Sequence, residues 1–216
     1  MEKNDWHCLL FTGHKNTDCE ADLVASLSGL GKVTKMSLYH KTSGSEEILP
    51  TLDVTELQDL LYQKDAVVYV PDVPDWNTSL ESLVENELKE LTYVLNAAQA
   101  AGISNFIFIS DIEGMGAAPR PVAIDENSLW SGQTNANDVQ KFWYLCEQEC
   151  RRAAEEGLNV LIIAASRMAK DPALQRTHVY TTSCLSLANS IQKCLMKQTS
   201  LQKIFVIQPV DQAIPT

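Results

Sequence analysis

Apolar runs alternate with helix-like patterns along this chain, and that alternation leaves few architectures open to it. Continuous runs such as 65–71 suit strands that are buried on both faces of a sheet. The runs predict strands at 6–12, 32–39, 65–71, 105–110, 159–166 and 203–209, and helical spacing predicts helices at 20–30, 54–63, 79–101, 138–156 and 183–197. Strands that alternate with long helices predict one doubly wound α/β domain, with a parallel sheet covered on both faces and right-handed crossovers.

Composition narrows the classes of partner. With 216 residues, 45% of them apolar and 21% charged, the chain suits one domain with a buried core. Its net charge of -11 would repel a polyanion and it has no basic stripe, so we expect no nucleic-acid partner. It has no apolar run long enough to span a membrane, and its first residues do not resemble a signal peptide. We therefore expect no membrane association and a cytoplasmic location.

The cysteines and histidines predict no metal site. The six cysteines form no Cys-x-x-Cys pair, and the four histidines do not fall at metal-ligand spacing. We expect buried or partly buried free thiols, including Cys146 and Cys150, which lie four residues apart on the apolar side of one predicted helix.

The segment 86–116, "NELKELTYVLNAAQAAGISNFIFISDIEGMG", resembles the extended or atypical short-chain dehydrogenase/reductase superfamily. That group includes NAD-dependent epimerases/dehydratases, 3-beta-hydroxysteroid dehydrogenases and NmrA-like proteins. The segments 52–70 and 177–209 are similar to further parts of its pattern. The resemblance implies a Rossmann-like single domain over 1–216. Its part from about 164 to 216 would be a reduced C-terminal substrate region. The family usually inserts substrate-domain elements between the segments that correspond here to "LIIAAS" and "THVYTT", and only residues 167–176 separate these two.

The resemblance also implies an NAD or NADP site after the first strand. The family's phosphate loop reads Thr-Gly-x-x-Gly-x-x-Gly, and here Thr12 and Gly13 match its start, whereas Asn16 and Cys19 replace the later glycines. Those side chains fill space through which pyrophosphate reaches the backbone. The other candidate cofactor residues are Asp53, at the acidic position near adenine, and Lys41, which could meet a 2'-phosphate. The alternative is that both are solvated loop charges, and this alternative is the stronger one for Lys41.

The family's chemistry resembles a Ser/Tyr/Lys arrangement, and this chain keeps one of the three groups. Tyr144 is the candidate tyrosine, but Gln148 stands where the lysine is expected and supplies no positive charge to ease proton loss from a phenol. Asp111 occupies the serine position, with Ser110 one residue before it. A purely structural reading of Tyr144 is that it covers a flank of the buried helix stripe.

Two functions remain open on these residues. The first is a catalytically degenerate Rossmann-fold protein that senses an unknown small molecule or binds a protein. The second is an atypical NAD(P)-dependent oxidoreductase or epimerase that uses Tyr144 as acid/base, Asp111 to orient the substrate, and Lys41 or Lys141 for phosphate or ribose. Relatives often dimerise through the helices expected here at 79–101 and 138–156, so a homodimer is a third expectation.

Overall fold

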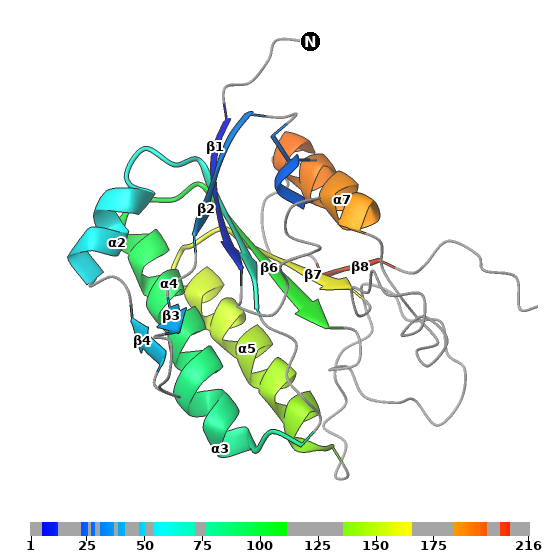
Figure 1. Cartoon of the computed structure of the whole chain (residues 1–216). Helices are drawn as coiled ribbons and strands as arrows, with labels where there is room; N and C mark the ends of the chain where they lie inside the picture. Colours follow the sequence, from blue (N-terminus) through cyan, green and yellow to red (C-terminus); the bar gives the residue numbers. More distant parts are fainter. Residues whose placement is uncertain are drawn as a thin grey trace, which may run out of the picture.

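The chain folds around a six-stranded sheet with the strand order β2-β1-β5-β6-β7-β8, in which every neighbouring pair is parallel (Figure 1). The computed structural model describes residues 6–12, 23–25, 27–28, 31–36, 39–41, 48–50, 54–71, 77–111, 136–165, 184–197 and 204–207. The strands of the sheet are β1 (Trp6–Thr12), β2 (Gly31–Met36), β5 (Ala66–Val70), β6 (Asn105–Asp111), β7 (Val160–Ala165) and β8 (Ile204–Ile207). The doubly wound parallel sheet expected from the sequence is confirmed.

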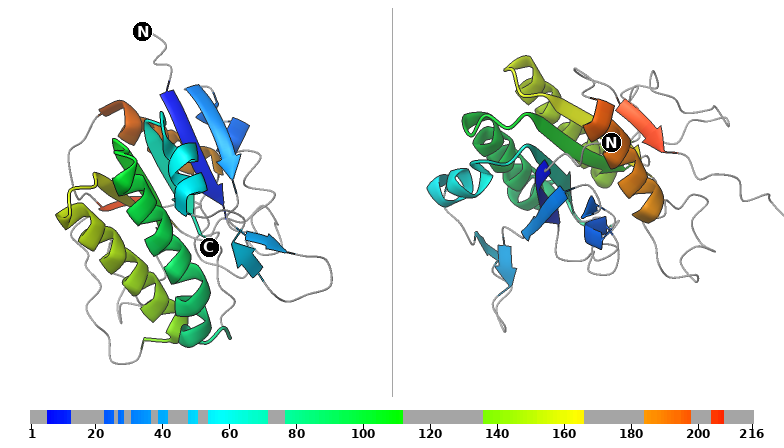
Figure 2. Two further views of the ribbon diagram at one scale, coloured as in Figure 1. Left: turned by 90° about the vertical axis from the view of Figure 1, so that its left-hand side faces the viewer. Right: turned by 90° about the horizontal axis from the view of Figure 1, so that it is seen from above.

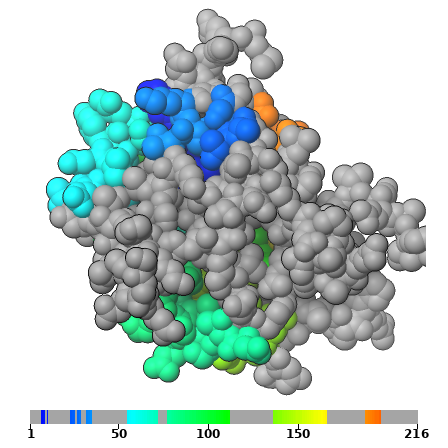
Figure 3. Space-filling view, viewed as in Figure 1, coloured from blue at the N-terminus to red at the C-terminus, as the bar shows by residue number. Residues whose placement is uncertain are grey.

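Helices cover both faces of this sheet, as Figures 1 and 2 show. On one face lie α2 (Val54–Leu61), the long helix made of α3 (Leu80–Leu83), η1 (Val84–Leu88) and α4 (Lys89–Ala100), and α5 (Asp138–Glu155). On the other face lie α7 (Cys184–Lys197) and the helical residues Leu23 and Leu27. Residues of β2, α2 and the start of the long helix reach the surface in the space-filling view (Figure 3).

Strand β6 shows how side-chain alternation divides the core into two layers. Phe106 and Phe108 pack with α4 and α5, whereas Ile107 and Ile109 pack with α7 on the opposite face. All four are at most 4% exposed. A strand in this position needs apolar residues at every step, because successive side chains point to opposite and equally buried faces.

The parallel registers bring the carboxyl ends of the strands to one edge. Thr12 at the end of β1 is paired with Val70 at the end of β5, and Asp111 at the end of β6 is paired with Ala165 at the end of β7. The chain order reverses at β1, whose two neighbours are β2 and β5. In sheets of this kind, ligands bind beyond the carboxyl ends of the strands near such a reversal.

The long helix contains one π turn, over Val84–Leu88. Asn86 lies within that turn, and its Nδ2 donates a hydrogen bond of 2.9 Å to the carbonyl oxygen of Ser82. A π turn widens the backbone ring, so a side-chain donor of this kind satisfies a carbonyl that the wider turn disturbs. The helix ends before Gly102, whose φ of 69° is the left-handed conformation expected of a stop residue.

Helix α5 begins at Asp138, the first residue of the helix expected at 138–156, and Asn137 occupies its N-cap. The Asn137 Oδ1 accepts from the backbone N–H of Gln140 at 2.8 Å, and the Gln140 Oε1 accepts from the backbone N–H of Asn137 at 3.1 Å. This reciprocal capping box satisfies two donors that the helix leaves unpaired.

Two short strands were missed in the sequence. The run 32–39 predicted one strand, but β2 ends at Met36, and Tyr39 instead begins β3 (Tyr39–Lys41), which pairs antiparallel with β4 (Ile48–Pro50) away from the main sheet. Lys41 therefore lies in a strand opposite Ile48 rather than in a loop.

Replacing Asn137 with Ala should lower the free energy of unfolding by about 0.5–2 kcal/mol, because the backbone N–H of Gln140 loses its acceptor. Urea denaturation followed by circular dichroism measures this change. Gln148→Ala is the matched control, since it places Ala at an exposed position inside the same helix and should change stability by less than about 0.5 kcal/mol. Equal losses in the two variants would contradict the capping role.

Candidate functional site

The candidate site lies at the carboxyl end of β6, where two polar residues interrupt the apolar core. Ser110 and Asp111 are the last two residues of β6 and are only 2% and 6% exposed. Both were sequence candidates, and the structure places them beside the end of β7. Buried polar groups at a sheet edge need hydrogen-bond partners, so the contacts of these two residues define the site.

The partner of Ser110 is a glutamate that the sequence analysis did not single out. The Ser110 Oγ donates a hydrogen bond of 2.6 Å to the Oε1 of Glu147 on α5. Glu147 is 7% exposed. Burial raises the pKa of its carboxyl, and the hydrogen bond from Ser110 and the charge of Arg151 offset only part of that rise. The site therefore contains an acid that holds its proton more tightly than an ordinary glutamate.

Helix α5 brings three relevant side chains within about one turn. Tyr144 is half-buried, Glu147 is buried and Gln148 is exposed. The expected apolar stripe of this helix is confirmed, since Val139, Phe142, Trp143, Cys146, Cys150 and Ala153 are all buried. Tyr144 lies beside that stripe, and Gln148 follows four residues later without a charge.

Asp111 does not share the side of Ser110, because it is still paired in β6 and its partner Ala165 packs in the layer of α7. Phe108 and Ser110 contact the layer of α4 and α5, so the next side chain points toward the layer of α7, where Ile107 and Ile109 pack. The geometry thus joins Ser110, rather than Asp111, to the helix that carries Tyr144.

The expected cofactor residues lie mostly outside the part of the chain that the structure describes. Gly13, Asn16 and Asp53 fall there, as does Cys19, which replaces a glycine of the phosphate loop. Thr12 ends β1 beside Val70, at the reversal of the strand order. Lys41 lies in β3, and the alternative phosphate ligand Lys141 instead pairs with Asp138, its Nζ lying 3.2 Å from Oδ1.

A second hydroxyl–glutamate contact lies on the neighbouring strand. The Tyr69 hydroxyl of β5 donates to the Oε1 of Glu90 on α4 at 2.9 Å. Burial raises the pKa of Tyr69 well above its ordinary range, and the charges of Glu90 and Glu87 raise it further.

A signal for Glu147 was present in the sequence, since it lies four residues after Trp143 and three before Cys150, in line with the buried stripe.

The thiols behave as core residues. Cys8, Cys146 and Cys150 are buried and free, and burial raises the pKa of Cys8 to about 12. Within the described ranges no group of three or more His, Cys, Asp or Glu side chains could hold a metal ion. Nor do those ranges contain a helix that is long and apolar enough to cross a membrane.

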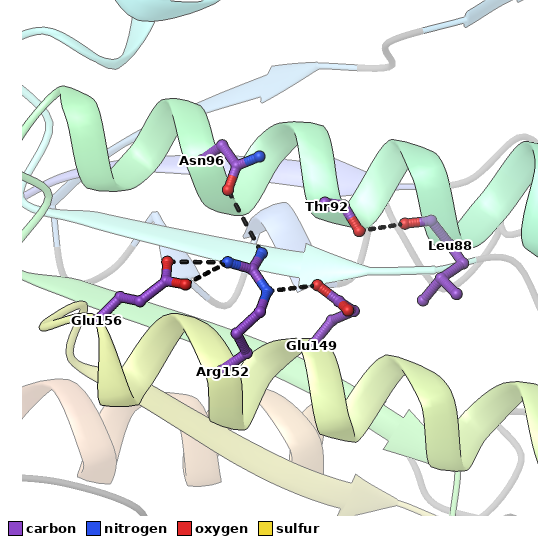
Figure 4. Close-up of polar contacts among 6 residues, drawn as sticks. All are labelled: Leu88, Thr92, Asn96, Glu149, Arg152 and Glu156. Atoms are coloured by element: carbon purple, nitrogen blue, oxygen red, sulfur yellow. Dashed lines mark hydrogen bonds and ion pairs between the residues drawn. The ribbon is translucent and has the colours of Figure 1, made fainter.

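The outer seam between α4 and α5 is polar. Arg152 binds both carboxylate oxygens of Glu156, at 2.7 and 2.8 Å, and its Nε donates to Glu149 at 2.9 Å (Figure 4). Its Nη2 reaches the Oδ1 of Asn96 on α4 at 3.5 Å. Figure 4 shows that this guanidinium bridges the two helices.

No protein-family model and no curated protein matches the chain in sequence, whereas solved structures match its fold. The terminal R domain from the myxalamid PKS-NRPS biosynthetic pathway matches with a TM-score of 0.73 at 15% identity, over 94% of this chain and 65% of that domain. The chain thus spans less than two thirds of that R domain.

Two epimerases from Bacillus cereus are also similar. UDP-N-acetylglucosamine 4-epimerase matches with a TM-score of 0.72 at 15% identity, and UDP-glucuronic acid 4-epimerase, solved in complex with NAD, with 0.71 at 14%. The matches cover 94% and 95% of this chain and 79% of each epimerase. These likenesses confirm the Rossmann-like fold and the shorter length of this chain beside its structural neighbours.

Replacing Ser110 with Ala should lower the free energy of unfolding near pH 7 by about 1–3 kcal/mol, because a buried carboxyl loses its hydrogen-bond donor. It should also raise the pKa of Glu147 further. Folded Glu147 keeps its proton to higher pH than the unfolded chain does, so stability falls as pH rises from the ordinary value of 4.5 to the raised pKa.

In Ser110→Ala that fall should extend to higher pH, which urea denaturation at a series of pH values measures. Ser104→Ala, at an exposed position just before β6, is the control and should follow the unmodified protein. A Ser110→Ala variant that shows the unmodified protein's stability at every pH would contradict the role of this hydrogen bond.

Proposed function

We propose that this chain is a catalytically degenerate member of the extended or atypical short-chain dehydrogenase/reductase superfamily. It acts in the cytoplasm by binding a small molecule or a protein partner rather than by hydride transfer. The observation that carries the proposal is the identity of two residues of α5 near the end of β6, neither of which is a cation. The position of the family's lysine holds the exposed, neutral Gln148, and the residue before it is the buried Glu147, bonded to Ser110.

The cations of α5 support this reading, because each lies beside a carboxylate. Lys141 pairs with Asp138, and Arg152 pairs with Glu149 and Glu156. The charge of Arg151 acts on Glu147. A family enzyme uses a cation one turn after its tyrosine to hold the cofactor ribose and to ease proton transfer, and here the three cations of α5 are engaged with acids.

The contact between Ser110 and Glu147 does not require a dinucleotide. The carboxyl groups of Asp111 and Glu147 are buried at the end of β6. If ionised, a carboxylate there would repel the two negative charges of a pyrophosphate by several kcal/mol at short range in a poorly solvated site. NAD or NADP is the cofactor that the resemblance implies, and the proposed function does not require it.

The alternative is an atypical NAD(P)-dependent oxidoreductase or epimerase with Tyr144 as acid/base. Its support is that α5 carries a half-buried Tyr144 less than one turn from Glu147, whose carboxyl contacts β6. In that case Asp111 would orient the substrate and Lys41 or Lys141 would meet phosphate or ribose. The homodimer expected from the resemblance would use the outer face of α4 and α5, where Arg152 and its partners lie.

Titration with NADH and NADPH separates the two functions. We expect no saturable rise in melting temperature and no saturable quenching of tryptophan fluorescence at micromolar cofactor. A ligand at one hundred times its Kd stabilises the folded state by about 2.7 kcal/mol, so binding would be obvious. The double variant Asn16→Gly/Cys19→Gly is the positive control, because restored glycines should allow pyrophosphate to approach the backbone.

Saturable binding of micromolar cofactor to the unmodified protein would contradict the proposal that its phosphate loop no longer binds a dinucleotide. Tyr144→Phe would then be assayed for turnover of carbonyl and sugar-nucleotide substrates, since it removes one hydroxyl and keeps the ring. Turnover lost in Tyr144→Phe would establish the alternative, and turnover unchanged would remove Tyr144 from the mechanism.

A further inference from the structure

The long helix made of α3, η1 and α4 behaves as one layer with α5, because polar contacts join the two along their length. At their start, the backbone N–H of Leu80 on α3 donates to the Oδ2 of Asp138 on α5 at 3.2 Å. Further along, Arg152 reaches Asn96 (Figure 4). At their end, the Nε2 of Gln99 donates to the carbonyl oxygen of Glu156 at 2.9 Å. A displacement of α5 from the sheet would therefore strain its contacts with α4.

Two hydroxyl groups on adjacent strands form hydrogen bonds to this layer of helices. Tyr69 on β5 donates to Glu90 on α4, and Ser110 on β6 donates to Glu147 on α5. Much of the surrounding contact is apolar, formed by aromatic and aliphatic side chains such as Phe108, Phe142 and Trp143. Apolar contacts have little directional preference, whereas a hydrogen bond fixes which residues face each other.

The two glutamates differ in their access to water. Glu90 is half-buried, so solvent stabilises its charge, whereas Glu147 is 7% exposed. Around Glu147, its own helix supplies Arg151 and the thiols of Cys146 and Cys150. Strand β6 supplies Ser110, with Asp111 next to it on the strand.

The other described elements near Glu147 add little to support its charge. The residues of β7 that face this layer are Val160, Ile162 and Ala164, which carry no charge. Across the layer, the charge of Glu87 acts on Cys146. An ionised Glu147 thus has one hydroxyl and one cation to support it against burial, which is why its pKa is raised.

We propose that Glu147 is a proton-dependent latch that seats α5, and with it Tyr144, on strand β6. With its proton bound, the carboxyl is a neutral partner for Ser110 and α5 lies closed on the sheet. When the proton leaves to solvent, a charge remains between the layers, and opening of α5 relieves it by hydration. This latch does not depend on whether the site binds a cofactor or a protein.

Hydrogen exchange of the full-length chain tests the latch. Protection of α5 amides, corrected for intrinsic exchange, should fall by up to about tenfold per pH unit above 4.5 and level off at the raised pKa of Glu147. Glu147→Gln keeps an acceptor for Ser110 but cannot ionise, so its α5 protection should not change over this interval. Glu155→Gln, an exposed position on the same helix, should behave as the unmodified protein does.

Three results would overturn the proposal. The first is the same pH dependence in Glu147→Gln and the unmodified protein. The second is a protection of α5 amides that equals the protection of α7, on the other face of the sheet, at every pH, because α5 would then open only with global unfolding, whose free energy also falls over this interval. If Glu147→Gln does not fold, carboxyl NMR titration of the unmodified protein replaces it, and the third result is a pKa of Glu147 that is not raised above the ordinary value of 4.5.

Discussion

The whole structure depends on burying strands β5 and β6 on both of their faces at once. Their side chains point alternately into two cores, one under α4 and α5 and the other under α7, and neither core is complete without its helices. This requirement explains why the apolar runs of these strands are continuous. It also explains why any polar group at their ends needs a partner from a helix, since water does not reach it.

Glutamates supply two of those partners. Tyr69 and Ser110 lie on the same face of adjacent parallel strands, and each donates to a helix glutamate, Glu90 or Glu147. A serine opposite a glutamate at this place differs from the serine, tyrosine and lysine arrangement of the resembled family. Here the end of β6 meets the acidic Glu147 of α5, and Gln148 stands where the resemblance implies a lysine.

Much of the fold could be predicted because its signal is local. The apolar run 65–71 predicts strand β5 from neighbouring residues alone. Gly102 ends its helix in a left-handed conformation that suits glycine. The hairpin of β3 and β4 escaped prediction because each strand has only three residues, and β3 includes the polar His40 and Lys41. The π turn escaped because it depends on hydrogen bonding within the folded helix.

The roles of the site residues stay predictions. The resemblance put Asp111 at the serine position, with Ser110 one residue before it, and named Tyr144 as the tyrosine. The structure brings β6, which carries Ser110, against α5, which carries Tyr144. Glu147 was missed because an acidic residue in an apolar stripe looks like an exposed position until its partner on β6 is known. The cofactor assignments at Gly13, Asn16 and Asp53 remain predictions, since they lie outside the described residues.

The π turn of Val84–Leu88 also sets the rotation of everything that follows it in the long helix. Each helical residue advances the chain by about 100° around the axis, and a π turn holds roughly one residue more than an α turn. Glu90 is the second residue after this turn, and its carboxylate accepts a hydrogen bond from Tyr69. The extra residue of the π turn rotates Glu90 about the helix axis and so aligns it with the sheet. The length of this segment, as much as its composition, therefore determines which side chains of α4 face the strands.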